Sequence, residues 1–467
     1  MTKRQLNLTL AGVIFAFTAY RAYIQAFTID EAFTYINYVQ HGWQGIFHGP
    51  FDANNHILYS ILEKFCKQWF GMSELSLRVP ALLGAALFLW STAELCTMLV
   101  PGLWFSILSF AVVVGSPLTL DFLSAARGYG LALALLAFAL LHWLEWLEDA
   151  KTGRIVIASA ALGLSVAANL IFAFAAIATL SVAILNLLKK PKLIPAAVLP
   201  AILIPLALWR PFFQDNYNRE AFYFGTPTIF AAIESFTSSL FVHDYQRGDP
   251  FGNWWTLYYF RVYILPVLAA QVLIAAFFWF RKRETQGLAF VTLVFLVTCF
   301  GNWLAHAWLG VLYPEERTGL SLIFLFLLAW TCAIGIWWQR GKLTRWCLAF
   351  PNLLIALVIA NQFAGQIDPR YLSPWRVNWT INEAMSRLPR SAAQGKVRTH
   401  WIYQSSAEYY RLRWKLPYDE IKREPDKFDL TDAGYFILPL QTEEDVATTG
   451  LRVVYRDAVS GTTLLSK

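Results

Sequence analysis

The sequence predicts an all-α membrane domain of about eleven transmembrane helices, followed by a small α/β domain outside the membrane. Of the 467 residues, 57% are hydrophobic and only 15% are charged, a composition too apolar for a soluble protein of this length. Apolar stretches of about 17–23 residues recur along the chain, and each is long enough to cross hydrocarbon. After about residue 364 the charge rises and short strand-like runs begin. We therefore expect a transmembrane domain over 1–363 and an α/β domain over 364–467.

The spans follow from hydropathy, one after another. In chain order they are about 6–25, 79–98, 101–119, 128–147, 155–170, 171–188, 193–209, 261–280, 287–309, 319–338 and 344–363. The stretch 155–188 is too long for one span and short for two, so we place a bend at Asn169. The first segment is of spanning length and lacks a small-residue cleavage site, so we expect it to remain a span rather than a signal peptide.

Orientation follows from five basic clusters, which all fall on one side if there are eleven spans. They are Lys3-Arg4, Lys151/Arg154, Lys189-Lys190/Lys192, Arg281-Lys282-Arg283 and Arg340/Lys342/Arg345. This side is then cytoplasmic, with the N-terminus inside and the C-terminal domain outside. The net charge of +7 largely reflects this asymmetry, and it argues against a nucleic-acid partner. The five cysteines show neither a disulfide framework nor metal-ligand spacing.

Two long outer loops are predicted, over 26–78 and 210–260. The first has helical patterning, and its aromatic and basic residues indicate helices in the interface, with Lys64, Lys67 and Arg78 as anchors. The second is rich in aromatics that suit the head-group region, namely Trp254-Trp255 and Tyr258-Tyr259. A loop of this length is more often functional than idle.

The C-terminal region alternates short strand-like and helical runs. The predicted strands are Val397–Tyr403, Tyr435–Leu438 and Leu451–Tyr455, and the predicted helices are Ser405–Trp414 and Glu443–Thr448. Gly450 and Gly461 indicate turns. No catalytic pattern stands out in this region, so we expect a lid, acceptor-docking or stabilising role.

Charged residues stand just beyond predicted membrane exits on the outer side. Asp30-Glu31 follows the first span, and Arg127 and Arg317 adjoin later ones. Charge near a bilayer is costly, so this placement indicates a site for an anionic lipid head group. The alternative for the acids is a capping box, since Thr28-x-x-Glu31 fits one. Arg127 could also snorkel to the interface, and Arg317 could belong to a solvated cluster with Glu315-Glu316.

Five short motifs carry a resemblance to a known family. They are Ile29-Asp30-Glu31-Ala32-Phe33-Thr34-Tyr35, Asn54-Asn55-His56-Ile57-Leu58-Tyr59, Glu74-Leu75-Ser76-Leu77-Arg78-Val79-Pro80, Ala126-Arg127-Gly128-Tyr129 and Tyr313-Pro314-Glu315-Glu316-Arg317. In order, spacing and sidedness they resemble the GT-C superfamily of glycosyltransferases, in the branch of protein O-mannosyltransferases and the lipid A aminoarabinose transferase. The resemblance covers about 5–340. Where those relatives often carry Pro-Pro-Leu, this chain has Asn55-His56-Ile57-Leu58.

The resemblance implies transfer of a sugar from a polyprenyl-phosphate donor to an acceptor, with inversion, at the outer face of the bacterial cytoplasmic membrane. It implies that Asp30, with Glu31 beside it, is the catalytic carboxylate, and that Arg127, Tyr129 and Arg317 bind the donor phosphate. Such a transfer needs a base for the acceptor proton and cations around the departing phosphate. Asn55 and His56 are the expected substrate-binding residues, and the acceptor is a lipid, a glycan or a protein.

A divalent metal is a further hypothesis. Asp121 lies six residues before Arg127, and its carboxylate could join Asp30 and His56 around a cation. The alternatives are an Arg127–Asp121 ion pair and a hydrogen-bonded interfacial histidine.

Other protein classes also fit the composition. A transporter would usually hold charges at mid-membrane or show an internal repeat, neither of which is visible, and a non-catalytic scaffold leaves the charge placement unexplained.

Overall fold

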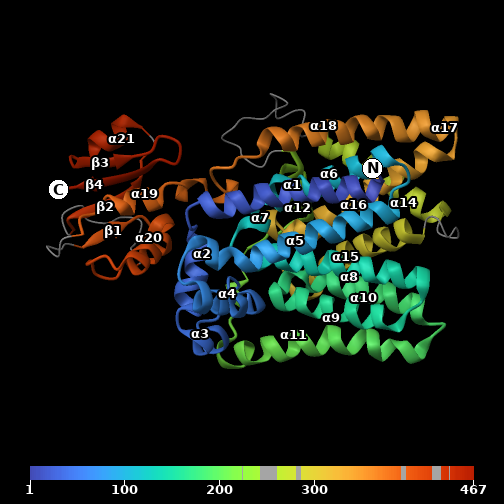
Figure 1. Cartoon of the computed structure of the whole chain (residues 1–467), viewed down its shortest axis with the longest axis horizontal. Coiled ribbons are helices and arrows are strands. Elements are labelled where there is room, and N and C mark those ends of the chain that lie inside the picture. The colour runs from blue at the N-terminus through green and yellow to red at the C-terminus, as the bar shows by residue number, and fades with distance from the viewer. Residues whose placement is uncertain (223, 242–259, 280–285, 391–395, 423–432, 441) are drawn as a thin grey trace.

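The apolar segments of the sequence form long helices that lie side by side in a bundle in the computed structural model of the chain (Figure 1). The structure describes residues 1–222, 224–241, 260–279, 286–390, 396–422, 433–440 and 442–467. Within these ranges, seven helices are long and apolar enough to cross a membrane, two bent pairs qualify together, and two apolar helices are shorter. They coincide with the eleven predicted segments, so the chain is a multi-pass membrane protein.

The seven long spans include short flanking turns in several cases. They are α5 (Glu74–Leu99), α8 (Gly128–Asp149), η2 (Leu170–Phe172) with α10 (Ala173–Leu187), η3 (Pro191–Leu193) with α11 (Ile194–Asn216), α15 (Gln286–Leu309), η8 (Glu316–Gly319) with α16 (Leu320–Arg340), and α17 (Lys342–Thr344) with η9 (Arg345–Ala349) and α18 (Phe350–Gln366). The shorter apolar helices are α9 (Thr152–Ala168) and η6 (Phe260–Ile264) with α14 (Leu265–Trp279).

Two spans are bent, and both bends lie at the same end of the bundle (Figure 1). α1 (Lys3–Ile24) meets α2 (Ile29–Thr34) and η1 (Tyr35–Val39) at 70°. α6 (Leu103–Val114) meets α7 (Pro117–Ser124) at 64°, within the segment predicted as one span over 101–119. Proline lacks an N–H and has a fixed φ, so it begins a helix readily but does not continue one, and Pro117 accordingly stands at the first position of α7.

The predicted bend within 155–188 is confirmed. α9 ends at Ala168, and Asn169 has an extended backbone with φ −159° and ψ 120°. Its side-chain oxygen accepts a hydrogen bond from the N–H of Ile171 at 3.1 Å and so caps the next turn. Asparagine suits this position because its amide can replace a missing helical partner.

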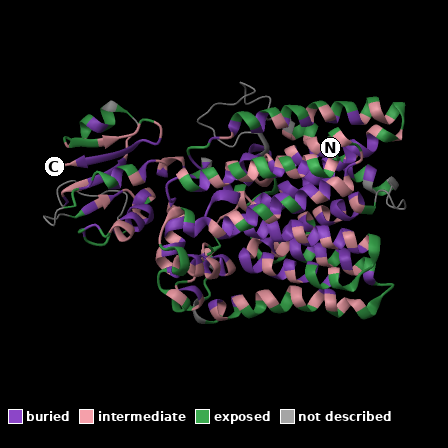
Figure 2. Ribbon diagram, in the orientation of Figure 1, coloured by how far each residue is buried: buried purple, intermediate pink, exposed green. Residues whose placement is uncertain are grey.

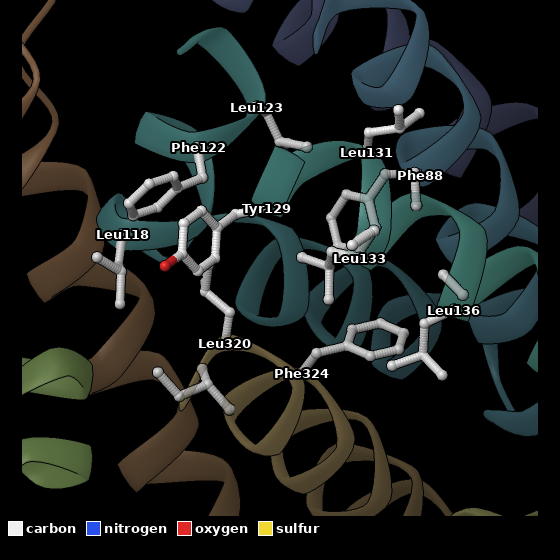
Figure 3. Close-up of a cluster of buried hydrophobic side chains, with 14 of the residues drawn as sticks. Phe88, Leu118, Phe122, Leu123, Tyr129, Leu131, Leu133, Leu136, Leu320 and Phe324 are labelled. Atoms are coloured by element: carbon white, nitrogen blue, oxygen red, sulfur yellow. The ribbon is translucent and has the colours of Figure 1, made fainter. Parts of the chain in front are cut away.

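The helices differ in how deeply they lie in the bundle (Figure 2). In the most apolar 18-residue stretch of the span that contains α16, 94% is buried, whereas in the corresponding stretch of the span that contains α11 only 11% is buried. α16 is therefore central, and α11 lies at the edge of the bundle. Close packing, rather than a hydrophobic driving force, holds helices together in lipid. An added Cβ on Gly84 would lie 3.0 Å from the Cα of Leu131, so the absence of a side chain lets α5 approach α8. Side chains of α5, α7, α8 and α16 fill the space between them (Figure 3).

The segment 26–78, predicted as the first outer loop, is helical as expected. It contains α2, η1, α3 (Gly42–His48) and α4 (Ile57–Phe70), which gather at one end of the bundle (Figure 1). The second loop contributes η4 (Arg219–Ala221) and α12 (Ile229–Phe241). The predicted aromatic pairs at 254–255 and 258–259 lie outside the described residues.

The C-terminal region forms a four-stranded sheet with helices, beyond the same end of the bundle (Figure 1). Its elements are η10 (Ser373–Asn378), α19 (Ile381–Ser386), β1 (Val397–Thr399), α20 (Trp401–Trp414), β2 (Tyr435–Pro439), α21 (Glu443–Thr448), β3 (Arg452–Arg456) and β4 (Thr462–Ser466). The strand order is β1-β2-β4-β3; β1 is parallel to β2, and the other pairs are antiparallel. Gly450 and Gly461 have φ of 64° and 73°, as suits turns. The sequence analysis missed β4, which occupies a central place in the sheet.

Candidate active site

α2 begins with a capping box that separates the two acids. The N–H of Thr28 donates to Oε2 of Glu31 at 2.8 Å, and the Thr28 hydroxyl accepts from the N–H of Glu31 at 3.4 Å. Neighbouring residues of a helix point about 100° apart. Glu31 is therefore turned into the protein, where it is fully buried, while the Asp30 side chain keeps 19% of its surface exposed.

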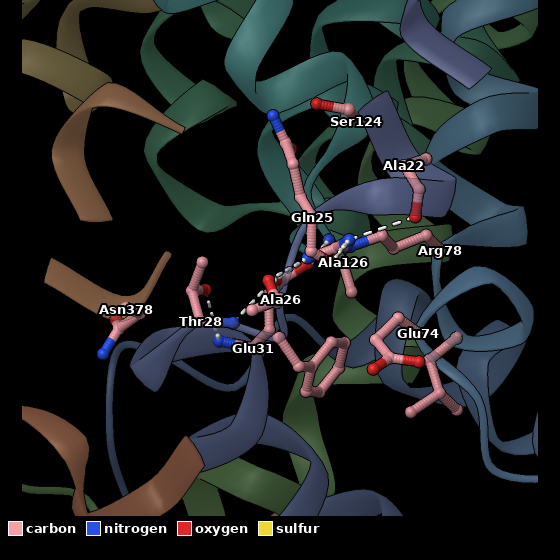
Figure 4. A network of polar contacts seen from close by, with 12 residues as sticks. Ala22, Gln25, Ala26, Thr28, Glu31, Glu74, Arg78, Ser124, Ala126 and Asn378 are labelled. Atoms are coloured by element: carbon pink, nitrogen blue, oxygen red, sulfur yellow. Dashed lines mark hydrogen bonds and ion pairs between the residues drawn. The ribbon is translucent and has the colours of Figure 1, made fainter. Parts of the chain in front are cut away.

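Glu31 forms a buried ion pair with Arg78 of α5 (Figure 4). Nε and Nη2 of Arg78 donate to its two carboxylate oxygens at 2.8 and 2.7 Å, and the N–H of Ala126 donates to Oε1 at 2.5 Å. The expectation that Arg78 is an interfacial anchor is wrong, because its side chain is fully buried. With both oxygens engaged, Glu31 is suited to hold α2, α5 and the turn before α8 together. Its predicted catalytic role stays a prediction.

Asp30 faces two arginines from distant parts of the chain. Its Oδ2 lies 3.9 Å from Nη2 of Arg127 and 3.8 Å from Nη1 of Arg317. Both separations exceed the usual 2.7–3.2 Å of a hydrogen bond, so the attraction is ionic. This leaves the lone pairs of Oδ2 available, although the atom is buried.

Arg127 ends the turn that follows α7, and its side chain is held rigidly. Nη1 donates to the carbonyl of Asp30 at 2.9 Å and to the Thr34 hydroxyl at 3.2 Å, and Nη2 donates to Oδ1 of Asn54 at 2.6 Å. Arg127 is only 1% exposed, which contradicts the snorkelling alternative. The sequence analysis missed Asn54, although it lies in the motif that was singled out.

Arg317 projects from a tight turn before α16. The preceding residue, Glu316, has φ of 41°, in the left-handed region that residues other than glycine rarely adopt. Strain of this kind is often retained where a side chain must be aimed. The guanidinium lies over the ring of Phe224, 4.0 Å from its centroid, and within hydrogen-bond reach of the Tyr129 hydroxyl. Because it faces Asp30 and is only 18% exposed, Arg317 does not belong to a solvated cluster with Glu315 and Glu316.

His56 packs edge-on against Tyr129, with ring centroids 5.2 Å apart. Gly128 makes this contact possible, since an added Cβ there would lie 2.8 Å from Cβ of His56 and 2.0 Å from the carbonyl oxygen of Ala168. Burial, aided by the positive charges of Arg127 and Arg317, holds the pKa of His56 well below its usual range. The imidazole is therefore neutral, and it can accept or donate a hydrogen bond according to its tautomer.

Asn55 points away from this cluster. Its amide nitrogen donates to the carbonyl of Ile46 at 2.9 Å, and its oxygen accepts from the Ser60 hydroxyl at 3.1 Å. It is fully buried. The structure therefore gives Asn55 a role in holding α3 against α4, and its neighbour Asn54 is the one that contacts the arginine.

Four buried polar atoms of the cluster have no hydrogen-bond partner among the described residues. They are Oδ2 of Asp30, Nε2 of His56, Nε of Arg127 and Nε of Arg317. Buried polar groups are nearly always paired, so a concentration of unpaired ones marks a place where a ligand binds. An oxyanion can satisfy both arginines, and a hydroxyl can satisfy the carboxylate.

The metal hypothesis for Asp121 is not supported by the geometry. Asp121 forms a buried ion pair with Arg21 of α1 rather than with Arg127. In the part of the chain that the structure describes, no three His, Cys, Asp or Glu residues are grouped so as to hold a metal ion. Asp121, Asp30 and His56 therefore do not form the predicted ligand set. Through its ion pair with Arg21, Asp121 instead joins α7 to α1.

An apolar cavity of about 290 Å³ adjoins the turn that carries Arg317. It is lined by α12, α14, α15 and α16, with Tyr313, Pro314 and Glu316 among its residues. A second, mostly apolar cavity of about 530 Å³ lies between α9, α10 and α11 and includes Arg210. The cavity of about 290 Å³ is thus the one that lies next to the cluster of Asp30, Arg127 and Arg317.

Two solved structures resemble the whole chain. The crystal structure of ArnT from Cupriavidus metallidurans bound to undecaprenyl phosphate matches 99% of this chain and 97% of its own, with a TM-score of 0.51 and 11% sequence identity. The apo crystal structure of the same protein gives the same coverage and identity, with a TM-score of 0.49. No protein-family model matches the sequence, and no curated protein matches it. The likeness to the first structure extends over the bundle and the C-terminal domain together, and it confirms the predicted fold: a bundle of membrane helices followed by a small α/β domain.

Proposed function

We propose that the chain is an integral-membrane glycosyltransferase that transfers a sugar from a polyprenyl-phosphate donor to an acceptor, with inversion. The observation that carries this proposal is the convergence of Arg127, Arg317 and Asp30, whose side chains present unpaired buried atoms to one another. Two guanidinium groups and one carboxylate leave a net positive charge, which favours an anionic ligand.

In this proposal the two arginines bind the donor phosphate. As the bond between sugar and phosphate breaks, negative charge grows on the phosphate oxygens. Guanidinium groups suit this task because they stay charged and donate two hydrogen bonds in a fixed plane. Arg127 is fixed by Thr34 and Asn54, and Arg317 by Phe224 and Tyr129, so little reorganisation is needed during the reaction.

Asp30 is the proposed base. Its Oδ2 takes the proton of the acceptor hydroxyl while the hydroxyl oxygen bonds to the anomeric carbon and the phosphate leaves with the bonding electrons. A single displacement of this kind inverts the anomeric carbon. His56 and Tyr129 border the same cluster and are the proposed contacts to the sugar or acceptor, whereas Glu31 and Asn55 are proposed to hold the scaffold.

The carrier and its placement are supported by two further observations. The ArnT structure of similar fold holds undecaprenyl phosphate. The apolar cavity beside Arg317 offers a place for the first prenyl units of such a lipid. The basic clusters support a cytoplasmic location for the opposite end of the bundle, so the reaction is proposed to occur at the outer face of the bacterial cytoplasmic membrane.

Binding of undecaprenyl phosphate to the purified chain tests this proposal. Mass spectrometry of gently purified protein should detect a bound polyprenyl phosphate, and added undecaprenyl phosphate should raise the melting temperature. Arg317→Ala should weaken binding by roughly 10- to 150-fold, since a hydrogen bond to a charged group contributes about 1.5–3 kcal/mol. Arg154→Ala, which removes an arginine paired with Asp149 on the predicted cytoplasmic side, is the matched control. Equal binding by wild type and Arg317→Ala would contradict the phosphate role.

A further inference from the structure

The turn between α1 and α2 sets the direction in which Asp30 points. The N–H of Gln25 still donates to a carbonyl of α1, and the carbonyl of Thr28 accepts from an N–H of α2, but the backbone groups between them need other partners. Arg78 of α5 is the partner of two carbonyl groups in this turn: its guanidinium donates to the carbonyls of Gln25 and Ala26, each at 2.8 Å (Figure 4). The N–H groups of Phe27 and Ile29 are bound from another side, by the C-terminal domain.

Tyr410 of α20 binds the first of these N–H groups. Its hydroxyl accepts from the N–H of Phe27 at 2.9 Å and donates to Oε1 of Glu74 at 2.9 Å, so it joins the turn to the start of α5. Tyr410 is fully buried. The neighbouring Tyr409 stacks on the ring of Phe27, with centroids 4.3 Å apart. One turn of α20 therefore holds both the backbone and the side chain of Phe27.

Asn378 binds the second N–H group. Its Oδ1 accepts from the N–H of Ile29, the first residue of α2, at 3.1 Å. Its Nδ2 donates to the carbonyl of Ile402, in the first turn of α20, at 2.9 Å. Asn378 is buried, so water does not readily replace it. The residue that follows Ile29 is the proposed base, Asp30.

We propose that the C-terminal domain positions the catalytic base, with Tyr410 and Asn378 as positioning residues that act through the backbone of α2. The inference rests on the proposed function, and it gives the C-terminal domain a task within that function. Misplacement of a reacting group by about 1 Å can lower a rate by about 100-fold. Tyr410 and Asn378 thus control the rate through the backbone of the turn, by setting where the carboxylate of Asp30 lies.

Hydrogen exchange of the full-length protein measures the turn directly. Tyr410→Phe keeps the ring but removes the acceptor of the Phe27 N–H, so peptides covering 26–35 should exchange about 10-fold faster or more, while peptides from α8 should not change. Tyr418→Phe is the matched control, because its hydroxyl binds the carbonyl of Pro389 within the C-terminal domain. If Tyr410→Phe does not fold, Asn378→Ala tests the same turn. Unchanged exchange at 26–35 would overturn the inference.

Turnover supplies the second measurement, with hydrolysis of a synthetic undecaprenyl-phosphate sugar as the probe. Water takes the place of the acceptor hydroxyl, its oxygen bonds to the anomeric carbon, and undecaprenyl phosphate is released. Tyr410→Phe should lower kcat by about 10- to 100-fold and leave KM for the donor unchanged. In an Asp30→Asn background it should cause no further loss, because the two changes act through one carboxylate. A wild-type kcat despite faster exchange, or an equal loss in both backgrounds, would overturn the inference. Full activity of Asp30→Asn would instead refute the base proposal, and the exchange data would still describe the turn.

Discussion

Asp30 and Glu31 are neighbours in the sequence, yet α2 turns their carboxylates toward different partners. The capping box at Thr28 is formed as the spacing indicates. The spacing does not indicate which residue pairs with Glu31. Arg78 lies 47 residues away, in a motif that also suits an interfacial anchor. A buried arginine and a snorkelling one occupy similar places in sequence, and only the packing of α5 against α1 and α2 distinguishes them.

Glu63 of α4 is a buried acid that the sequence analysis passed over. Both of its carboxylate oxygens are buried and have no hydrogen-bond partner among the described residues. Burial, with the nearby charge of Glu31 adding to it and those of Arg127 and Lys67 opposing it, raises the pKa of Glu63 well above its usual range. Folding therefore favours proton uptake by this carboxyl at pH values above its usual pKa.

Glu63→Gln should consequently stabilise the protein at neutral pH. The sign follows from proton uptake: above about pH 4.5 the unfolded state binds fewer protons than the folded state, so this group lowers stability as the pH rises. The neutral amide removes that penalty. We expect the melting temperature to rise by a few degrees at pH 7.5, and the gain to shrink as the pH falls toward 4.5. Glu420→Gln, at a side chain that is 64% exposed, is the control; a gain independent of pH would contradict the explanation.

At the scale of elements, the start of α8 brings Arg127 and Tyr129 close to His56. Gly128→Ala should destabilise the protein by about 1–3 kcal/mol, because the new methyl group would overlap the carbonyl of Ala168 and the side chain of His56. Activity should fall as well, since Arg127 and Tyr129 flank the glycine. Gly153→Ala in the first turn of α9 meets no atom within 4 Å and should leave both properties unchanged or raise stability slightly. Similar melting temperatures for the two variants would contradict this packing.

The elements also show where sequence-based prediction succeeds. Spans are recognised reliably because a run of about twenty consecutive apolar residues is rare outside membrane-spanning helices. Asn169 indicates a bend because it is a polar residue within such a run. The bend at Pro117 was missed because the apolar run continues through it. β4 was missed because Thr462–Ser466 lacks clear alternation: four of its five residues are buried. A central strand covered on both faces has little periodicity for a sequence to reveal.

At the scale of the whole molecule, the site assembles from five separate segments of the chain. Asp30, Arg127 and Arg317 were recognisable as charges beside predicted exits, and the family resemblance indicated their roles. Asn54, Thr34 and Phe224, which hold the arginines, were not recognisable, because small polar and aromatic residues are common in loops. The separation of Asp121 from the cluster depends on the bend between α6 and α7, which hydropathy does not predict.

The arrangement of the whole molecule also predicts its orientation. α20 packs on α2, so the C-terminal domain and the charged cluster lie at the same end of the bundle (Figure 1). If the basic clusters are cytoplasmic, a fluorescent protein that matures only in the cytoplasm should stay dark when it is fused after Lys467. The same protein fused before Met1 should fluoresce. A bright C-terminal fusion would show that the number of spans is even.

The central claim is that Asp30 is the base, and Asp30→Asn tests it most directly. Asparagine keeps the shape of the side chain and is tolerated at the start of a helix, but it cannot take up the acceptor proton. Turnover, melting temperature and undecaprenyl phosphate binding should be measured on one preparation. We expect turnover to fall by about 10²- to 10⁴-fold while folding and donor binding are retained. Near-normal turnover with a small drop in melting temperature would contradict the claim and leave Asp30 with the role of stabilising the first turn of α2.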